Sequence, residues 1–283
     1  MYGHINLFEL DPRDRGLIYS ASRISLCQQP DGAPGREYLM GERGLPPRTI
    51  ADFRMGFVPF SVRSPLGKPL AGRIIMPIFD AYDDLVALSA RPIWDRMCAK
   101  CQKPFRNTQT FIEGCCPVCS QEGEKIEPKY WNEHFPKGEH LYGLSIAKYE
   151  IVRTGFAIGV EGQLDVASMH SCGFGNTVGV MGGAMTHLHV LQLARWTKML
   201  VLLFDGDDAG AKHLRRATDL LAAYNLRGKF SPKPIFVGCE AMLPRGSDPD
   251  KFVRKEGSRA MREIIVSAIK RAGQAVPEGY EKC

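Results

Sequence analysis

The sequence predicts an α/β fold with an α+β N-terminal subdomain, and three observations lead to this prediction. From residue 154 onward, short apolar runs alternate with helix-like stretches, which predicts parallel strands joined by helices through right-handed crossovers. Before residue 95, helix-like stretches precede two apolar runs that flank an Asp-rich turn, as in a β-hairpin. A polar, Cys-rich insertion lies between these parts, at residues 95–128. We therefore expect a Rossmann-like parallel sheet with helices on both faces in the second half of the chain.

Length and composition are those of a globular chain with about two domains. The chain has 283 residues, of which 44% are hydrophobic and 24% charged. Its apolar runs are too short to cross a bilayer, and the first residues lack the pattern of a signal peptide, so we expect a cytoplasmic protein without a membrane partner. The net charge of +6 is mild. Residues 36–73 are locally basic, which fits either a polyanionic substrate or an ordinary solvated surface.

Local patterns predict each N-terminal element in order. Mixed apolar and polar spacing indicates helices, and the Gly-Leu-Pro-Pro break at 44–47 ends the second of them. Thr49 is the predicted N-cap of the helix that follows. The Asp-rich turn at 80–84 joins two strands. The predicted elements are helices at residues 17–25, 35–43 and 50–55, and strands at residues 72–79 and 85–90.

The C-terminal elements follow from the alternation of strand-like and helix-like segments. Each apolar run is four to six residues long, as expected for a buried parallel strand, and each is followed by an amphipathic stretch. The predicted strands are at residues 156–160, 176–181, 199–204 and 234–237. The predicted helices are at residues 164–172, 187–196, 209–224 and 259–270, and the segment 248–257 precedes the last of them.

Acidic residues follow two of the predicted strands directly. Glu161 comes after the strand at 156–160, and Asp205-Gly206-Asp207 comes after the strand at 199–204. Because open α/β sheets build their sites at the carboxyl ends of their strands, we expect these carboxylates to converge. Converging carboxylates repel one another unless a cation lies among them, and hard oxygen ligands suit Mg²⁺. Each cluster alone could be a surface acid or a turn; together they predict a metal site for phosphoryl or nucleotidyl transfer.

Further acids and glycines extend this prediction. Asp165 lies one helical turn after Glu161, while Asp248 and Asp250 follow the last strand and could either join the site or start a helix. Gly206 and Gly210 are expected to leave room for a phosphate or a metal near the backbone. The Gly-rich turn at 182–186 either cradles a phosphate or simply makes a tight turn.

Four cysteines are spaced as a pair of Cys-x-x-Cys knuckles, Cys98/Cys101 and Cys116/Cys119. Two such knuckles separated by fourteen residues match a zinc ribbon, whose metal would supply the folding free energy that a short insertion lacks. Cys115 is an alternative ligand. A closed four-cysteine site is structural rather than catalytic. Its basic residues Lys100, Lys103 and Arg106 either contact nucleic acid or belong to a plain scaffold.

Several motifs, taken in order, resemble a known family. Glu161-Gly162-x-x-Asp165, Gly183-Ala184-x-Thr186 and Asp205-x-Asp207-x-Ala209-Gly210 together resemble a TOPRIM domain. Motifs outside it are similar to those of the catalytic core of DnaG-type bacterial and phage DNA primases, and the resemblance covers roughly residues 15–260. They are Tyr38-Leu39-x-x-x-Arg43-Gly44-Leu45, Ile50-x-x-Phe53-x-x-Gly56-Phe57-x-Pro59, Gly72-Arg73-Ile74-x-x-Pro77-Ile78, Ala90-Arg91-Pro92, Lys129-Tyr130-x-Asn132, Lys137-Gly138, Leu141-Tyr142-Gly143-Leu144 and Leu243-Pro244-x-Gly246-x-Asp248-Pro249-Asp250.

The resemblance implies a function, a set of partners and a role for each matching residue. It implies a DNA primase, a nucleotidyltransferase that makes short RNA primers on single-stranded DNA for DNA replication, with NTPs as substrates and a replicative helicase as a candidate partner. We expect a monomer. The implied Mg²⁺ or Mn²⁺ ligands are Glu161, Asp205 and Asp207, with Asp165, Asp248 and Asp250 as supporting catalytic acids. The implied nucleic-acid and NTP-binding residues are Arg73, Arg91, Lys129, Asn132 and Lys137. The alternative interpretation is that they are ordinary surface residues without a binding role.

The resemblance also divides the chain. It implies a basic primase-core subdomain at residues 1–150 that contains the zinc-ribbon insertion at 95–128, a TOPRIM domain at 151–258, and a C-terminal helix and tail at 259–283. The family usually has a separate zinc-binding domain before this core and a helicase-binding domain after it. Neither is expected within this sequence, a layout that suits a phage or another mobile element. We hypothesise that the inserted ribbon takes over template contact from the missing zinc-binding domain.

Two other functions remain open at this point. A TOPRIM metal-dependent nuclease would use the same carboxylates to activate water, and a RecR-like protein would bind DNA without catalysis. The primase-like motifs argue against the first, and the lack of a helix-hairpin-helix segment argues against the second. His187, His189 and His213 are expected to be solvated or packed rather than ligands. Trp94 and Trp131, which flank the ribbon, either pack or stack on bases.

Overall fold

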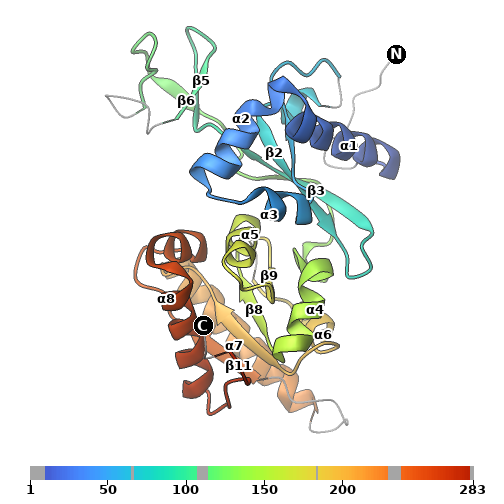
Figure 1. Cartoon of the computed structure of the whole chain (residues 1–283), viewed down its shortest axis with the longest axis vertical. Helices are drawn as coiled ribbons and strands as arrows, with labels where there is room; N and C mark the ends of the chain where they lie inside the picture. Colours follow the sequence, from blue (N-terminus) through green and yellow to red (C-terminus); the bar gives the residue numbers. More distant parts are fainter. Residues whose placement is uncertain (1–9, 65–66, 107–113, 183, 229–236, 281–283) are drawn as a thin grey trace. The chain divides into compact units, whose positions relative to one another are not determined.

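The computed structural model describes residues 10–64, 67–106, 114–182, 184–228 and 237–280. The chain divides into two compact units (Figure 1), and each is described by itself. The first unit contains Met1–Glu42, Arg54–Pro77 and Ala87–His134, and the second contains Arg43–Phe53, Ile78–Val86 and Phe135–Cys283. The domain boundaries drawn from the sequence stay predictions. No helix in the described ranges is long and apolar enough to span a membrane.

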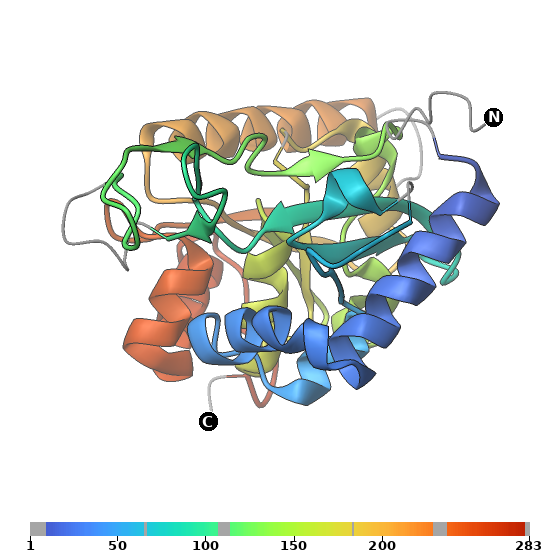
Figure 2. The same cartoon turned by 90° about the horizontal axis from the view of Figure 1, so that it is seen from above.

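The first unit begins with helices. Helix α1 (Pro12–Gln28) starts with Pro at its first position and with Asp11 as its N-cap, whose side chain accepts a hydrogen bond from the Asp14 N–H at 2.8 Å. It packs against strand β1 (Gly56–Val58), as the blue helix in Figure 2 shows. A 3₁₀ turn (Pro30–Gly32), helix α2 (Ala33–Arg36) and a π-helical turn (Glu37–Glu42) follow.

The helix predicted to start at Thr49 starts earlier. Helix α3 (Pro47–Asp52) has Pro46 as its N-cap residue, and no side chain caps it. Thr49 is buried inside this helix, so the predicted N-cap is wrong. The physical reason is Pro47, whose fixed φ and missing N–H suit the first helical position and remove the need for a side-chain cap two residues later.

Antiparallel pairing builds the sheet of the first unit, with strand order β1-β2-β3-β7. The predicted hairpin is confirmed by β2 (Arg73–Phe79) and β3 (Leu85–Pro92). At its tip, which clusters with the second unit, the Asp80 carboxylate accepts hydrogen bonds from the N–H groups of Tyr82 and Asp84. The short edge strands β1 and β7 (Trp131–Asn132) lie outside the sequence prediction.

The Cys-rich insertion forms its own three-stranded antiparallel sheet, in the order β5-β4-β6. Its strands are β4 (Arg96–Cys98), β5 (Pro104–Phe105) and β6 (Gly123–Lys125). The small core consists of Cys98, Phe105 and Cys116, with Cys101 and Cys119 packed against them. A fold with so little apolar core fits a zinc ribbon, as the sequence predicted.

The second unit contains the predicted parallel sheet, with strand order β11-β10-β8-β9 and all neighbours parallel. Tyr142 adds an antiparallel bridge to Gly179 on the β9 edge. Of the strand predicted at 234–237, residues 234–236 lie outside the described residues, and the described strand runs on to Ala241. The strands are β8 (Ala157–Val160), β9 (Thr177–Gly179), β10 (Met199–Leu203) and β11 (Val237–Ala241).

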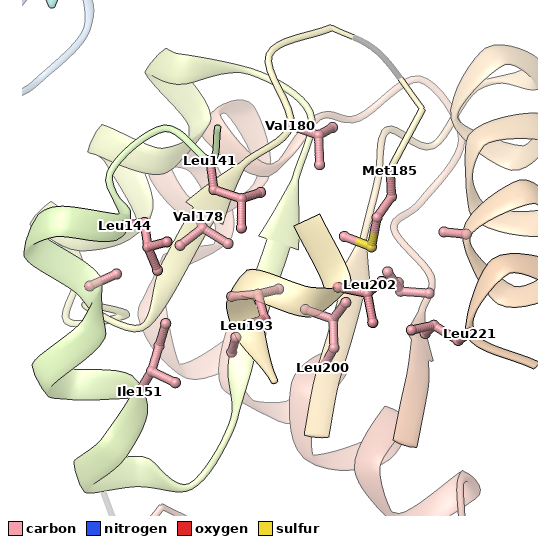
Figure 3. Packing of buried hydrophobic residues seen from close by; sticks show 14 of the residues in the cluster. Leu141, Leu144, Ile151, Val178, Val180, Met185, Leu193, Leu200, Leu202 and Leu221 are labelled. Carbon is pink, nitrogen blue, oxygen red and sulfur yellow. The ribbon is translucent and has the colours of Figure 1, made fainter. Parts of the chain in front are cut away.

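Helices cover both faces of this parallel sheet, which confirms the prediction. Leu200 and Leu202 of β10 point into a core shared with α4 (Leu144–Thr154), α6 (His187–Leu193) and α7 (Asp208–Gly228), as Figure 3 shows. Helix α5 (Gln163–Ser171) packs on α8 (Pro249–Arg271), and α8 contacts β10 and β11. Gly257 interrupts α8 with a φ of 84°, so the helix predicted at 259–270 is the second part of one kinked element that already starts at Pro249.

Candidate functional site

Glu161 and Asp205 meet at the carboxyl ends of neighbouring strands. Glu161 follows β8 and Asp205 follows β10 after Phe204; β8 and β10 pair in parallel. The backbone N–H of Asp205 lies 3.4 Å from Glu161 Oε1, so the two strand ends are joined through this carboxylate. The topology therefore brings together the first pair of residues that the sequence predicted as metal ligands.

Asp205 is an unusual carboxylate. Its Oδ1 is buried and has no hydrogen-bond partner among the described residues. Burial, together with the negative charges of Asp165, Glu161, Asp248 and Asp207, raises its pKa to about 7. An orphaned carboxylate oxygen surrounded by other acids is the environment in which a cation is stabilising. These residues therefore fit a divalent metal.

Asp207 has a different environment. Its side chain is exposed and caps helix α7, because Oδ1 accepts a hydrogen bond from the Gly210 N–H at 2.8 Å. A carboxylate has a second oxygen, which this bond leaves for a ligand. Among the described residues, the only group of three or more ligand atoms within 4.8 Å of one another is the cysteine cluster, so the carboxylates are more widely spaced.

His213 belongs to this site, although the sequence gave no reason to choose it. Its Nδ1 lies 3.0 Å from Glu161 Oε2, and its ring meets the Phe204 ring edge-on. Both members of the pair are shielded from solvent, with side-chain exposures of 22% for His213 and 14% for Glu161. His213 is packed against Phe204, as expected, but the sequence did not predict its contact with Glu161. No local pattern distinguishes it from the other histidines.

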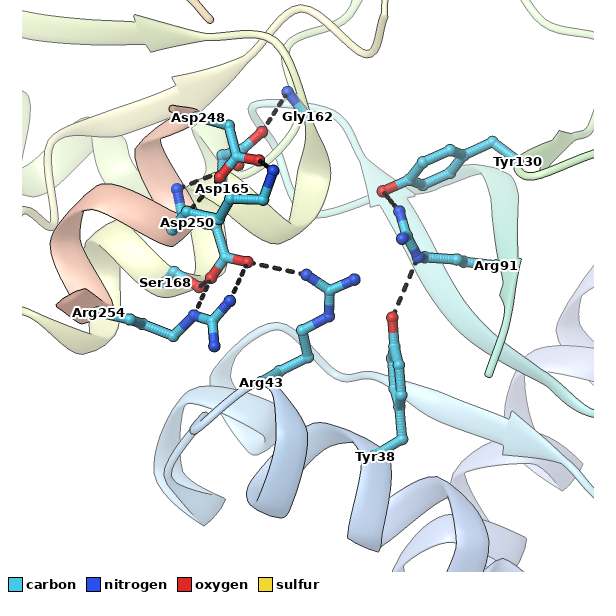
Figure 4. Close-up of polar contacts among 11 residues, drawn as sticks. Tyr38, Arg43, Arg91, Tyr130, Gly162, Asp165, Ser168, Asp248, Asp250 and Arg254 are labelled. Atoms are coloured by element: carbon cyan, nitrogen blue, oxygen red, sulfur yellow. Dashed lines mark hydrogen bonds and ion pairs between the residues drawn. The ribbon is translucent and has the colours of Figure 1, made fainter. Parts of the chain in front are cut away.

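Asp165, Asp248 and Asp250 surround the starts of helices α5 and α8 (Figure 4). Asp165 accepts hydrogen bonds from the N–H groups of Gly162 and Asp250. Burial, together with the charges of Asp248 and Asp250, raises its pKa to about 6. Asp248 caps α8 through the Lys251 N–H at 2.7 Å. Asp165 and Asp248, two of the predicted supporting acids, therefore stabilise the starts of helices.

Asp250 is buried and neutralised by cations. Arg43 donates to its Oδ2 at 2.8 Å, Arg254 donates to both oxygens, and the Ser168 hydroxyl donates to Oδ1 at 2.5 Å (Figure 4). A carboxylate with this many donors has little capacity left for a metal. The geometry gives Asp250 a structural role at the start of α8.

Gly206 and Gly210 are required by close approach of the protein's own backbone. A Cβ at Gly206 would lie 2.3 Å from the Pro244 carbonyl oxygen, and a Cβ at Gly210 would lie 2.0 Å from the Asp205 carbonyl oxygen. The expectation that these glycines leave room for a phosphate or metal is therefore replaced by a packing reason: they let the Asp205 loop fold back on itself.

The Gly-rich turn after β9 is described only in part, because Gly183 lies outside the described residues. Met181 and Gly182 have positive φ values of 61° and 76°. Thr186 caps α6 by accepting a hydrogen bond from the His189 N–H, and its hydroxyl donates to the Gly138 carbonyl at 2.5 Å. Phosphate binding at this turn stays a prediction.

The four ribbon cysteines come together as predicted. All four Sγ atoms lie within 4.8 Å of one another, with Cys98–Cys119 at 3.4 Å and Cys101–Cys116 at 3.6 Å. Tetrahedral zinc with Zn–S bonds of about 2.3 Å needs sulfur atoms roughly 3.8 Å apart, so these cysteines fit that ion. A hydrogen bond from the Cys101 backbone N–H lowers the pKa of the Cys98 thiol to about 6.

The two knuckles share one backbone shape. The residue after each second cysteine, Gln102 and Ser120, has a φ of 55°. In each knuckle the N–H of this residue donates to the carbonyl of the first cysteine. Cys115 lies outside the cluster of four, so the alternative ligand is not part of the group that the structure brings together.

Arg73 and Arg91, predicted to bind nucleic acid, are both held by the first unit. Arg73 is buried and donates to the carbonyls of Glu127 and Pro128, and its burial lowers its pKa. Arg91 donates to the hydroxyls of Tyr38 and Tyr130 and lies over the Tyr130 ring at 5.0 Å (Figure 4). Both contacts fix the guanidinium groups in place.

The remaining predicted binding residues differ in environment. Lys129 is exposed, and Asn132 has a buried Oδ1 without a hydrogen-bond partner among the described residues. Burial lowers the pKa of Lys137. The Lys137 carbonyl lies 2.9 Å from His189 Nε2, which ties the segment to α6. Nucleic-acid binding by these residues stays a prediction.

Comparison with known proteins agrees with this geometry. Residues 156–230 match the family model of the Toprim domain. The DNA primase of Aquifex aeolicus is 31% identical over 240 residues, which cover 82% of this chain and 44% of that protein. This chain therefore spans less than half the length of that curated relative.

Solved structures have the same fold. The structure of the zinc-binding and RNA polymerase domains of the Aquifex aeolicus primase superimposes with a TM-score of 0.67 at 25% identity, over 92% of this chain and 63% of that one. A DnaG catalytic core superimposes with a TM-score of 0.69 at 24% identity, over 93% of this chain and 79% of that one, and shows the fold alone. The chain is thus a Toprim-domain protein. More narrowly, it has the fold of the DnaG primase catalytic core, with a zinc ribbon inserted in its first unit.

Proposed function

We propose that the protein is a DNA primase that synthesises short RNA primers on single-stranded DNA by metal-dependent nucleotidyl transfer. The observation that carries this proposal is the meeting of Glu161 and Asp205 at the ends of two parallel strands, in a chain similar to DNA primases. The raised pKa and orphaned oxygen of Asp205 support a site for divalent cations. A Toprim domain and a primase relative both imply divalent metal use, and we assign Mg²⁺ or Mn²⁺ to Glu161, Asp205 and Asp207.

The side chains of the site have separable tasks in this proposal. His213 holds one oxygen of Glu161, which leaves the other directed toward Asp205. Asp207 keeps one oxygen on the α7 cap and presents the other outward. Asp165 and Asp248 add negative charge around Asp205. The bound metal, when present, lowers the pKa of the attacking 3′-hydroxyl and neutralises charge on the triphosphate.

Binding of template and nucleotides belongs to the basic residues in this proposal. Arg91, Lys129, Asn132 and Lys137 are proposed to contact phosphates or bases of single-stranded DNA, primer and NTPs, and Arg73 to shape the segment before Lys129. We assign Zn²⁺ to the four-cysteine cluster, in a structural role. A replicative helicase is the proposed protein partner.

The test is template-directed RNA synthesis by the purified protein. Single-stranded DNA, labelled NTPs and Mg²⁺ or Mn²⁺ are incubated with wild type and with Asp207→Asn, and Asp219→Asn serves as control because Asp219 is an exposed acid on the same helix. We expect short, RNase-sensitive products from wild type and the control, and roughly 100-fold fewer from Asp207→Asn. Metal-dependent loss of the template instead would identify a nuclease, and binding without synthesis would favour a RecR-like role.

A further inference from the structure

A cationic pocket lies at the root of the zinc ribbon, within the first unit. Its volume is about 300 Å³, at the lower end of the range for small-molecule sites. The end of β3 and both chain segments that enter and leave the ribbon contribute to its lining. Four lining side chains are cationic and two are acidic. The cationic residues are Arg91, Arg96, Lys125 and Lys129, and the acidic residues are Asp95 and Glu127.

The pocket combines arginines that are held by hydrogen bonds with lysines that are exposed. Arg91 is held by two tyrosine hydroxyls, and Arg96 donates to the Gly123 carbonyl at 2.5 Å. Lys125 and Lys129 are exposed, and neither forms an ion pair with a described residue. Preset arginines beside adaptable lysines are well suited to a phosphate group.

An aromatic pair adjoins these cations. Trp94 lines the pocket, and its ring lies 4.9 Å from the Phe60 ring at an angle of 46°. Phe60 is 46% exposed, so its ring is accessible to a ligand. Phe60 rests against Gly72, where a Cβ would lie 2.5 Å from the ring. The pair is therefore fixed by the protein before any ligand arrives.

Phosphate-binding cations next to an exposed aromatic surface match one ligand chemistry. A nucleotide carries a phosphate for the cations and a flat base for the aromatic rings. An acidic peptide would use the cations but leave the aromatic pair without a partner. The sequence resemblance supplies Arg91 and Lys129, but Arg96 and Lys125 come from the ribbon segment, and Trp94 directly precedes it.

We propose that this pocket binds one nucleotide, with its phosphate on Arg91, Lys125 and Lys129 and its base against Trp94 and Phe60. The proposal rests on the proposed function, because it names where that activity holds a nucleotide. The ribbon then contributes directly to substrate binding through its root. The nucleotide belongs either to single-stranded DNA or to a free NTP, and these two sources are separated by experiment.

The experiment measures equilibrium binding in two arms, without catalysis in either. Fluorescence anisotropy follows a labelled oligo-dT in the absence of NTPs, and a fluorescent ATP analogue in the absence of DNA. The variants are Trp94→Ala, Trp94→Phe and Lys125→Ala in the full chain. Tyr149→Ala and Lys198→Ala are matched controls, since both side chains are exposed and lie in the second unit. Circular dichroism and bound zinc report whether each variant folds.

We expect Trp94→Ala to weaken binding roughly 5- to 150-fold in one arm, and Trp94→Phe to retain most of the affinity. Lys125→Ala lowers the slope of log affinity against log salt by about 0.7, as loss of one phosphate contact on a single strand requires. A loss confined to oligo-dT identifies template, and a loss confined to the ATP analogue identifies an incoming nucleotide. Each outcome supports the pocket.

Other results overturn the proposal. If folded Trp94→Ala and Lys125→Ala bind both ligands like wild type, the pocket does not bind a nucleotide. Primer synthesis by wild type, measured separately, keeps the proposed function standing in that case. If wild type binds neither ligand and makes no primer, the proposed function fails together with the pocket. If Trp94→Ala does not fold, the binding affinity of Lys125→Ala, with Trp94→Phe as the folded variant at position 94, decides whether the pocket binds a nucleotide.

Discussion

Asp205 is a carboxylate whose surroundings favour its neutral form in the absence of a cation. Its buried oxygen has no hydrogen-bond partner in the described part of the chain, and four nearby acids oppose its ionisation. The sequence pattern predicted that Asp205 lies at the carboxyl end of a strand. The pattern could not predict the pKa, which depends on Asp165 and Asp248 reaching the same place from helix starts elsewhere in the chain.

The raised pKa of Asp205 should make the free energy of unfolding depend on pH. The pKa rises from 3.8 to about 7 on folding, so the folded state binds the extra proton, and its stabilising effect is present below pH 4 and lost as pH rises through 7. In metal-free buffer, wild type should lose stability relative to Asp205→Asn between pH 4 and pH 7. Denaturant unfolding at several pH values measures this.

Divalent metal should reverse the difference. Mg²⁺ or Mn²⁺ binds the folded wild type and stabilises it by mass action, whereas Asp205→Asn gains much less. Identical pH dependence of wild type and Asp205→Asn, with no metal effect on either, would contradict this account of Asp205.

His213 should influence the affinity of the site for metal through its contact with Glu161. Its Nδ1 holds the Glu161 carboxylate, and loss of such an outer contact typically lowers metal affinity 10- to 100-fold. We expect His213→Ala to weaken Mn²⁺ binding by about that factor in calorimetric titration. His213→Asn should restore much of the affinity, because the Asn side-chain N–H₂ can take the place of Nδ1–H.

Lys212→Ala is the matched control for His213, since Lys212 is exposed on the same helix. A merely structural role for His213 would lower thermal stability in both His213 variants and leave the Mn²⁺ affinity of the folded protein unchanged.

At the scale of elements, the long periodic segments were predictable and the short ones were not. The parallel strands and their helices follow from apolar runs at regular spacing. Strands β1, β5 and β7 have two or three residues, too few for a period to show, and their pairing partners are distant in the chain. The start of α3 was missed because the conformational preference of Pro47 outweighs the capping preference of Thr49.

The start of helix α8 depends on a buried ionic contact. Asp250 pairs with Arg43 and Arg254, and Asp250 itself has only 4% side-chain exposure. Removing one partner of such a pair leaves the others uncompensated. We expect Asp250→Ala to lower the free energy of unfolding by about 3 kcal/mol in denaturant titration, the low end for a buried pair because both arginines reach solvent.

An exposed acid provides the comparison for Asp250. Asp219→Ala on α7 should change the free energy of unfolding by less than about 0.5 kcal/mol. An equally small effect of Asp250→Ala would show that the contact contributes nothing to the start of α8.

The zinc ribbon is an element whose stability should depend on its metal. Its core holds little besides Phe105 and the cysteines, so the ion would supply the folding free energy. A strong chelator, or Cys101→Ser, should make residues 95–128 sensitive to protease while fragments from residues 135–283 stay protected. Mass spectrometry of a limited digest measures this, and full resistance of the chelated protein would count against a metal-dependent ribbon.

At the scale of the whole molecule, the two units carry complementary chemistry. The second unit holds the carboxylates at its strand ends, and the first unit holds the cationic pocket and the zinc ribbon. Sequence motifs marked the strand ends where Glu161 and Asp205 meet and the knuckles whose four cysteines cluster. They did not predict His213, Arg43 or Phe60, whose partners are set only by tertiary packing.

The central claim is that Glu161 and its neighbours carry out metal-dependent RNA synthesis. The most direct measurement is the rate of primer synthesis on single-stranded DNA as Mg²⁺ is raised, for wild type, Glu161→Gln and the control Asp219→Asn. We predict that Glu161→Gln loses at least about 100-fold in rate, while its affinity for single-stranded DNA stays that of wild type. Primer synthesis by Glu161→Gln at the wild-type rate and Mg²⁺ dependence would contradict the account.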